Sequence, residues 1–386
     1  MTARTAITGA RIFDGDLWHE DSALLIDGGK VAGIVARKEL PGDARIVPMD
    51  GLSLVPGFID LQVNGGGGVL LNERPDLDGI RTICAAHARF GTTALLPTLI
   101  TDNRAVTTDT IAAGLAARKA NVPGFLGLHL EGPHLSVARK GAHDPQLIRP
   151  MEQADLDRTI AARQGLEALL MTLAPENASN AQIAALKAAG VTVSLGHSDC
   201  GYRTAAAAVE AGASMMTHLF NAMSPLGHRE PGMVGAALDL GHLNAGLIAD
   251  GFHVDPASIG VALRAKRGPG RIFLVTDAMS TIGTDMTSFF LNGREIFREG
   301  GRLTLADGTL AGADIDMASC IRFMRDHAGI GLEEALRMAS LYPAEAIGMT
   351  GRKGRLTHGH DADFAVIGRD VDVVSTWIAG TPVFAA

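Results

Sequence analysis

Four apolar, strand-like segments of the chain each end in a residue that can bind a metal ion or a proton. An ionisable side chain at the tip of a buried strand is costly unless a cation or another partner lies beside it. The segments are 125–131, 191–197, 214–218 and 272–277, which end in Glu131, His197, His218 and Asp277. Since the carboxyl ends of parallel barrel strands meet at one mouth, this pattern indicates a parallel barrel with a metal site at that mouth.

The central part of the chain repeats one order, a strand followed by a helix. Eight such units can be recognised, which is the number in a (β/α)8 TIM-like barrel and favours an α/β fold. The expected strands are 58–64, 93–98, 125–131, 168–173, 191–197, 214–218, 245–249 and 272–277. The expected helices are 76–90, 103–120, 152–164, 179–189, 203–212, 255–266, 314–327 and 332–347, with a further helix after the long loop that follows residue 218. We therefore predict a metal-dependent catalytic barrel at residues 56–354.

Both ends of the chain are rich in short β segments and turn residues. The candidate strands are 6–13, 22–26, 30–35, 362–367, 371–374 and 375–383. Because chain termini often lie close together, we expect residues 1–55 and 355–386 to form one small β-sandwich domain. Residues 288–309 have the pattern of a β-hairpin with an Asn-Gly turn and are expected beside the mouth of the barrel.

Composition excludes several classes of protein. The chain has 386 residues, and 34 basic against 42 acidic residues give a formal net charge of −8, which argues against nucleic-acid binding. No segment approaches the ~18 apolar residues of a membrane span, and the first residues lack the apolar core of a signal peptide. Three widely spaced cysteines without a CxxC pair favour a reduced cytoplasm. We expect a cytoplasmic protein that binds neither nucleic acid nor membranes.

Glu131, His197 and His218 form a set of one carboxylate and two imidazoles. Such ligands suit Zn²⁺ or Fe(II) and leave a coordination position open for water. The alternative is three unrelated buried polar groups that are satisfied by hydrogen bonds. Repetition of the pattern at three strand ends favours the metal site.

Asp277 ends the eighth expected strand and should face the barrel axis, on the same side as Phe273 and Val275. A carboxylate beside an activated water can take its proton and hand it to a leaving group. The alternatives for Asp277 are a helix N-cap and a salt-bridge acid. Because its side chain is expected to point toward the barrel axis, the role of general base is favoured.

Polar residues alternate along the first expected barrel strand. Asp60, Gln62 and Asn64 share one face of this strand, and the glycines at 65–68 let the backbone approach a ligand closely. Amides are poor ligands for zinc. We therefore expect Gln62 and Asn64 to hydrogen bond to the substrate or to the metal ligands.

The long loop 217–232 follows the sixth expected strand. The backbone N–H groups of Asn221 and Ala222 and the guanidinium of Arg229 suit an anionic group. The alternative for Arg229 is a surface ion pair with Glu230 or another acid. Histidines on other predicted mouth loops, each of which alone is more often an ordinary polar residue, are His134, His143 and His253.

With these residues in view, the chain resembles the N-acetylglucosamine-6-phosphate deacetylase family of the amidohydrolase superfamily over nearly its whole length. The motifs that carry the resemblance are Pro56-Gly-Phe-Ile-Asp-Leu-Gln-Val-Asn-Gly65, His129-Leu-Glu-Gly-Pro-His134, Lys140-Gly-Ala-His143, Gly196-His-Ser198, Thr217-His-Leu-Phe-Asn-Ala-Met223, Arg229-Glu-Pro-Gly232 and Thr276-Asp-Ala278. The superfamily usually carries His-x-His on the first strand, where this chain has Gln62-Val-Asn64. The resemblance therefore implies one divalent metal per subunit, with zinc expected and Fe(II) or another divalent ion as alternatives.

The resemblance implies hydrolysis of the acetamide of N-acetyl-D-glucosamine 6-phosphate to D-glucosamine 6-phosphate and acetate, in amino-sugar catabolism. It implies that Asp277 acts as base and then as acid to the leaving amine, and that His143 hydrogen bonds the acetyl oxygen. The groups expected to hold the phosphate, some of them from the neighbouring subunit of a homodimer, are Asn221, Ala222, Arg229 and His253.

Two alternatives stay open. One is another amidohydrolase, of the dihydroorotase-like or D-aminoacylase-like kind, because the fold alone would allow it. The other is a non-catalytic barrel protein. Such a protein would tolerate loss of the Glu/His/His/Asp set, and this chain has all four residues.

Overall fold

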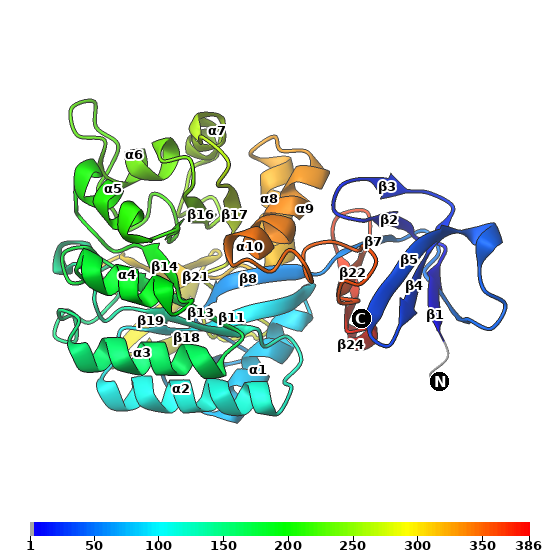
Figure 1. Cartoon of the computed structure of the whole chain (residues 1–386), viewed down its shortest axis with the longest axis horizontal. Coiled ribbons are helices and arrows are strands. Elements are labelled where there is room, and N and C mark those ends of the chain that lie inside the picture. The colour runs from blue at the N-terminus through cyan, green and yellow to red at the C-terminus, as the bar shows by residue number, and fades with distance from the viewer. Residues whose placement is uncertain (1–3) are drawn as a thin grey trace.

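The computed structural model describes residues 4–386, in which a large barrel lies beside a smaller β domain (Figure 1). The barrel sheet has eight parallel strands in the order β17-β16-β15-β14-β13-β12-β11-β8. These strands are β8 (Phe58–Val63), β11 (Thr92–Ile100), β12 (Gly127–Glu131), β13 (Ala168–Leu173), β14 (Thr192–Leu195), β15 (Met215–Met216), β16 (Asn244–Leu247) and β17 (Ile272–Leu274). A parallel bridge from Val63 to Ala278 links the first strand to the segment after the last. The predicted TIM-like barrel is confirmed.

Helices follow the strands and cover the outside of the barrel (Figure 1). They are α1 (Leu77–Ala88), α2 (Arg104–Lys119), α3 (Gln153–Gly165), α4 (Asn180–Ala188), α5 (Tyr202–Ala211), α6 (Gly232–Asp239), α7 (Pro256–Ala265), α8 (Met317–Asp326), α9 (Leu332–Ala339) and α10 (Leu341–Ala346). The single helix expected at 332–347 is wrong: it is divided into α9 and α10 at Ser340, because Pro343 lacks the N–H that would continue the first helix. Among residues 4–386, no helix combines the length and the apolar character needed to cross a membrane.

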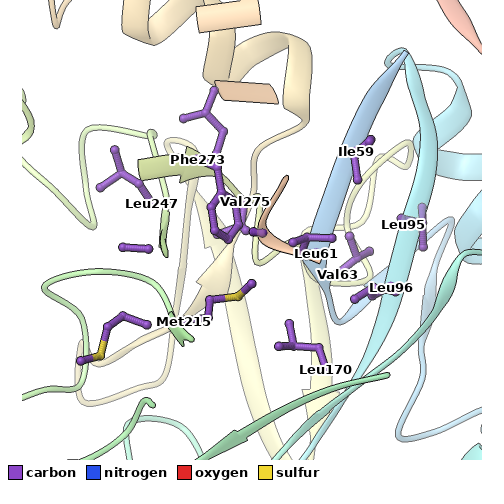
Figure 2. Close-up of a cluster of buried hydrophobic side chains, with 14 of the residues drawn as sticks. Ile59, Leu61, Val63, Leu95, Leu96, Leu170, Met215, Leu247, Phe273 and Val275 are labelled. Atoms are coloured by element: carbon purple, nitrogen blue, oxygen red, sulfur yellow. The ribbon is translucent and has the colours of Figure 1, made fainter. Parts of the chain in front are cut away.

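Apolar side chains from six of the barrel strands and the segment after β17 belong to one buried cluster (Figure 2). The labelled residues, all of them buried, are Ile59, Leu61, Val63, Leu95, Leu96, Leu170, Met215, Leu247, Phe273 and Val275. Burial of large aliphatic and aromatic side chains is the main stabilising contribution to such a core. It holds the strands in place, so that polar side chains at their ends occupy fixed positions.

Strands from both chain ends form the smaller domain, where both termini lie (Figure 1). Its six-stranded sheet contains β24 (Thr381–Ala385), β23 (Val373–Ile378), β22 (Phe364–Ile367), β7 (Ser53–Pro56), β2 (Arg11–Phe13) and β3 (Trp18–His19). Its four-stranded sheet contains β5 (Lys30–Ala36), β4 (Ser22–Asp27), β1 (Thr5–Thr8) and β6 (Arg45–Pro48). One apolar cluster joins side chains of both sheets, among them Ile7, Leu24, Phe364 and Trp377, which confirms a sandwich built from both ends.

The predicted domain limits, 1–55 with 355–386 and 56–354, stay a prediction, and residues 1–3 lie outside the described part of the chain. The strand expected at 6–13 is wrong: it is divided between β1 and β2, which belong to different sheets. Gly9 lies between them with φ +83°, a left-handed conformation that glycine adopts readily. The chain therefore turns from one sheet to the other at this residue.

The segment expected as a hairpin is a larger, four-stranded sheet. Its strands are β18 (Ser288–Leu291), β19 (Arg294–Glu299), β20 (Arg302–Thr304) and β21 (Leu310–Ala313). One face of this sheet, which includes Phe289, Leu291 and Ile296, packs in a cluster with Ile100 and Met279 of the barrel. The insertion therefore forms a wall beside the mouth, next to the short pair β9 (Gly65–Gly66) and β10 (Val69–Leu70).

Candidate metal centre

Three strand ends bring one carboxylate and two imidazoles into contact. Oε1 of Glu131 lies 3.3 Å from Nε2 of His197 and 3.2 Å from Nε2 of His218. The two Nε2 atoms are 3.0 Å apart. Ligand atoms of a tetrahedral zinc ion lie about 3.3 Å from one another, given bonds of about 2.0 Å. The three atoms therefore form a triangle of the size needed to hold one divalent ion.

The ring of His197 has the tautomer that a metal ligand needs. Its Nδ1 lies 2.8 Å from the carbonyl oxygen of Arg139. A carbonyl oxygen only accepts hydrogen bonds, so Nδ1 carries the proton and Nε2 presents its lone pair to the triangle. His218 lacks this support, because its buried Nδ1 has no hydrogen-bond partner among the described residues.

Charge at the triangle favours a cation. Burial raises the pKa of Glu131, but its contacts with the imidazoles of His197 and His218 outweigh burial and hold the pKa well below its usual range. Burial lowers the pKa of His218, and the contact with Glu131 outweighs that effect and raises it. An ionised carboxylate that attracts a proton to a neighbouring imidazole would attract a divalent ion to the same place.

His143 forms a second group of potential ligands with Glu131 and His197, whose ligand atoms all lie within 4.8 Å of one another. However, Nδ1 of His143 lies 2.8 Å from the hydroxyl of Thr101, which can donate or accept, and 3.3 Å from the backbone N–H of Thr101, which can only donate. Nδ1 therefore has no proton, and Nε2 carries it. Burial, followed by the charge of His197, lowers the pKa of His143 to about 3, so the ring is neutral. His143 thus presents an N–H rather than a lone pair, so the set whose geometry better fits a metal ion is Glu131, His197 and His218.

Asp277 lies beside the triangle. Its Oδ1 accepts hydrogen bonds from Nδ2 of Asn64 at 2.7 Å and from Nε2 of Gln62 at 3.1 Å. Burial, then the negative charge of Glu131, raise the pKa of Asp277 to about 6. A carboxylate with a pKa near neutrality can both accept and return a proton.

A cavity of about 380 Å³ opens onto these groups. Most of the predicted site residues line it, namely Asn64, Glu131, His143, His197, His218, Asn221, Ala222, His253 and Asp277. Gln62 is buried and does not line this cavity; its Nε2 donates to Oε1 of Glu131 at 3.0 Å as well as to Asp277. Arg229 is exposed on its loop and does not line the cavity.

Sequence patterns missed part of the cavity wall. The insertion contributes Leu291 and the segment 309–312, and the loop before His143 contributes Arg139, whose guanidinium donates to Asp199 at 2.7 Å. The insertion was expected near the mouth, but no periodicity indicated which of its residues face the cavity. Arg139 lies within the loop after the expected strand 125–131 and not at the strand end, so the pattern that indicated Glu131, His197, His218 and Asp277 does not include it.

Several site residues share a strained backbone. His197, His218 and Asp277 have φ of +48°, +26° and +53°. Non-glycine residues rarely adopt such values, which cost on the order of 1–3 kcal/mol each and tend to cluster at functional sites. In each case the chain turns sharply where its strand ends, and the turn brings the side chain to the mouth.

His253 lines the cavity and is fixed by a neighbouring acid. Its Nδ1 lies 2.6 Å from Oδ2 of Asp250, and both side chains are buried. Asp250 also accepts from the backbone N–H groups of Phe252 and His253. The imidazole is therefore held in one orientation at the cavity wall.

A closed parallel barrel with a buried Glu/His/His cluster and an aspartate at one mouth defines a barrel hydrolase. A model of the amidohydrolase family matches residues 53–383, and the chain belongs to this family. The N-acetylgalactosamine-6-phosphate deacetylase of Shewanella sp. (strain ANA-3) is 41% identical over 380 residues, covering 98% of this chain and 95% of the relative. The N-acetylglucosamine-6-phosphate deacetylase of Haemophilus influenzae is 35% identical over 365 residues, covering 93% and 94%.

Two solved structures with a similar fold have the same kind of name as these relatives. The N-acetylglucosamine-6-phosphate deacetylase from Pasteurella multocida superimposes with a TM-score of 0.95 at 34% identity, covering 99% of this chain and 100% of the other. A structure of the Mycobacterium smegmatis enzyme of the same name, in complex with N-acetyl-D-glucosamine-6-phosphate, gives 0.90 at 31% identity, with 99% and 100% covered. The resemblance of the sequence to this deacetylase family is confirmed.

Proposed function

We propose that the chain hydrolyses the acetamide of N-acetyl-D-glucosamine 6-phosphate to D-glucosamine 6-phosphate and acetate, in amino-sugar catabolism. The observation that carries this proposal is the Glu131–His197–His218 triangle, with Asp277 in the same cavity. The deacetylase names of relatives at 35% and 41% identity support it. One divalent ion per subunit, expected to be zinc, with Fe(II) or another divalent ion as alternatives, would polarise the water and the acetyl carbonyl there.

Asp277 carries the proton in this reaction. Its carboxylate takes a proton from the attacking water and later delivers it to the amine nitrogen as the C–N bond breaks. Nε2–H of His143 donates to the acetyl oxygen as negative charge develops on it. The neutral state of His143 supports this assignment, because its proton is held on the nitrogen that remains free to donate.

The phosphate would lie at the part of the cavity lined by Asn221, Ala222 and His253. Arg229 is exposed and does not line the cavity of its own chain. We therefore propose a homodimer in which Arg229 reaches the phosphate of the neighbouring subunit. A planar guanidinium suits this task because it can donate to two phosphate oxygens at once.

A second substrate deserves equal testing, because the Shewanella relative at 41% identity is named for the galactosamine epimer. Both N-acetylhexosamine 6-phosphates should be assayed together with their unphosphorylated parents, and the purified protein analysed for metal. We expect acetate release from one phosphorylated epimer with about one metal equivalent per subunit. If acetate is released from neither, while dihydroorotate or an N-acyl-D-amino acid is hydrolysed, another amidohydrolase activity is correct.

The role of Arg229 can be separated from that of its loop. Arg229→Ala should raise KM for the phosphorylated sugar by a factor that corresponds to a binding free energy of roughly 1.5–3 kcal/mol, the range for a charged hydrogen bond. It should barely change the activity on the unphosphorylated parent. Mixing Arg229→Ala with Asp277→Asn should regenerate some complete sites if Arg229 acts across the interface. Equal loss on both substrates would instead assign Arg229 to the loop, and no recovery in verified mixed dimers would place it in its own subunit's site.

We also propose that the protein works in the cytoplasm. Its three cysteines, Cys84, Cys200 and Cys320, are buried and unpaired, which suits a reducing compartment. A non-catalytic role is disfavoured because the carboxylate, the two imidazoles and Asp277 surround one cavity. Activity of the purified protein on any substrate of the panel above decides this point.

A further inference from the structure

The first barrel strand, β8, holds the segment that carries Asp277. The backbone N–H of Asp277 donates to the carbonyl of Gln62 at 2.9 Å, and the N–H of Asn64 donates to the carbonyl of Ala278 at 2.9 Å. These bonds fix the main chain on both sides of Asp277. Side chains of β8, together with Asn64 directly after it, add a second set of contacts. These contacts reach the carboxylate of Asp277 and the residue before it.

Asp60 fixes the residue before Asp277. It is fully buried, and its Oδ2 accepts from the hydroxyl of Thr276 at 2.6 Å. Its Oδ1 accepts from the backbone N–H of Thr276 and of Gln62, both at 3.2 Å. Since Asp277 adopts a left-handed φ of +53°, a tether on Thr276 stabilises a turn that the backbone would otherwise avoid.

Gln62 and Asn64 act on one oxygen of Asp277. Both side-chain amides donate to Oδ1, and Asn64 also donates to the Asp277 carbonyl at 3.3 Å. Among the described residues, no group hydrogen bonds to Oδ2. Asp277 nevertheless lines the cavity. Two amide donors on Oδ1 therefore leave Oδ2 as the oxygen available to a reacting molecule.

We propose that Asp60, Gln62 and Asn64 are positioning residues that orient Asp277 and select its Oδ2 as the oxygen that exchanges protons. This inference rests on the proposed function and deepens it. Oδ2 takes the proton from water, carries it while the C–N bond breaks, and returns it to the amine nitrogen. Gln62 matches the expected bond to a metal ligand, because its amide donates to Glu131 as well as to Asp277. Asn64 donates to Asp277 instead of to a residue of the triangle.

Asn64 is the cleanest residue to test, because among the described residues its side-chain amide donates only to Asp277, whereas Gln62 also donates to Glu131. Asn64→Leu should lower kcat by roughly 10- to 100-fold, the range expected when a catalytic group is displaced by a fraction of an ångström to an ångström, with KM and metal content unchanged. On an Asp277→Asn background, Asn64→Leu should cause no further loss, since residues that act through one another are not additive. A rise in KM, or a full additive loss in the double variant, would overturn the inference.

Thr276 provides an independent test of the Asp60 contact. Thr276→Val removes the hydroxyl that Asp60 accepts from and should lower kcat, whereas Thr276→Ser keeps the hydroxyl and should restore most of it. Thr92→Val is a matched control, because Thr92 is a buried barrel threonine whose hydroxyl has no partner among the described residues. Equal effects of Thr276→Val and Thr92→Val would contradict a positioning role for Asp60.

A crystallographic comparison separates this inference from the proposed function. In Asn64→Leu the carboxylate of Asp277 should turn away from its wild-type position, while Glu131, His197 and His218 stay in place. If the wild-type protein releases no acetate from either sugar phosphate, the proposed function fails, but this comparison still decides whether Asn64 orients Asp277. An unchanged Asp277 in the variant would overturn the inference even in a fully active enzyme.

Discussion

The position of a single proton distinguishes the histidines at the mouth. His197 holds its proton on Nδ1, against the carbonyl of Arg139, and turns a lone pair toward Glu131. His143 has the opposite tautomer, because the N–H of Thr101 occupies its Nδ1. The two imidazoles, whose centroids lie 4.4 Å apart, thus present different atoms to the cavity: a lone pair from His197 and an N–H from His143.

Removal of a ligand imidazole should remove the metal and the activity together. His218→Asn is expected to lose both, because it leaves only Glu131 and His197 to hold the ion. His253→Asn, in the same cavity but outside the triangle, should retain its metal. Elemental analysis of the purified variants measures the difference. Two tightly held equivalents in the wild type, both needed for turnover, would contradict a single site.

Asp277→Asn keeps the shape of the side chain but cannot accept a proton. Turnover should fall by about 10²-fold or more, the usual contribution of a general base. Metal content should stay close to that of the wild type, because Asp277 is not part of the triangle. Steady-state kinetics and elemental analysis on one preparation test both statements, and wild-type turnover would make Asp277 a structural residue.

The alternation of side chains along strands was sufficient to predict Glu131, His197, His218 and Asp277, because each ends an apolar run. It was not sufficient for the partners of Gln62. Those partners, Glu131 and Asp277, come from other strands, and their distance from Gln62 depends on how the barrel closes and on the left-handed turn at Asp277. A single strand carries no information about either.

At the scale of elements, one buried carboxylate adds to the apolar contacts that hold the insertion β18–β21 against the barrel. Asp314 is largely buried and accepts from Nε of Arg298 at 2.6 Å and from the hydroxyl of Thr281 at 2.8 Å. Arg298 also donates to the carbonyl of Thr284 at 2.8 Å. The sequence predicted that an insertion lies here, but its four strands and this anchor depend on contacts with distant residues.

Arg298→Met should loosen the insertion by leaving Asp314 without its charged partner. We expect the free energy of unfolding to fall by about 1–3 kcal/mol, the cost of leaving a buried polar group unsatisfied. Glu295→Gln, an exposed residue of the same strand, should change it by less than about 0.5 kcal/mol. Denaturant unfolding of the two variants makes the comparison, and equal stabilities would show that Arg298 does not anchor the sheet.

At the scale of the whole molecule, Asp361 links segments that are distant in sequence. It accepts hydrogen bonds from Lys30, from Arg352 at 2.7 Å and from Lys353 at 3.0 Å. Burial raises the pKa of Asp361, but the bond from Lys30 and the charge of Lys353 outweigh it and hold the pKa below its usual range. A carboxyl group with a lowered folded-state pKa stabilises the fold above its unfolded pKa, about 3.9, and loses this contribution as the pH falls.

Asp361→Asn should therefore destabilise the protein most at neutral pH, by roughly 1–3 kcal/mol. The difference from the wild type should shrink as the pH falls below about 4, where the ionised carboxyl of the wild type begins to lose its stabilising contribution. Urea unfolding at a series of pH values measures this change. Asp370→Asn, on the surface, is the control, and a difference that stays constant with pH would contradict the ionic origin of the effect.

The six-stranded sheet of the small domain pairs β7 with β22, although the whole barrel lies between them in sequence. During synthesis on the ribosome, β7 emerges long before β22. The six-stranded sheet therefore cannot be completed until the C-terminal strands have also left the ribosome. The barrel strands have all been synthesised by then. A premature stop before residue 364 would thus leave the edge of β7 unpaired, and exposed strand edges promote association between chains. Nonsense truncations near the C-terminus should consequently yield aggregates rather than smaller enzymes.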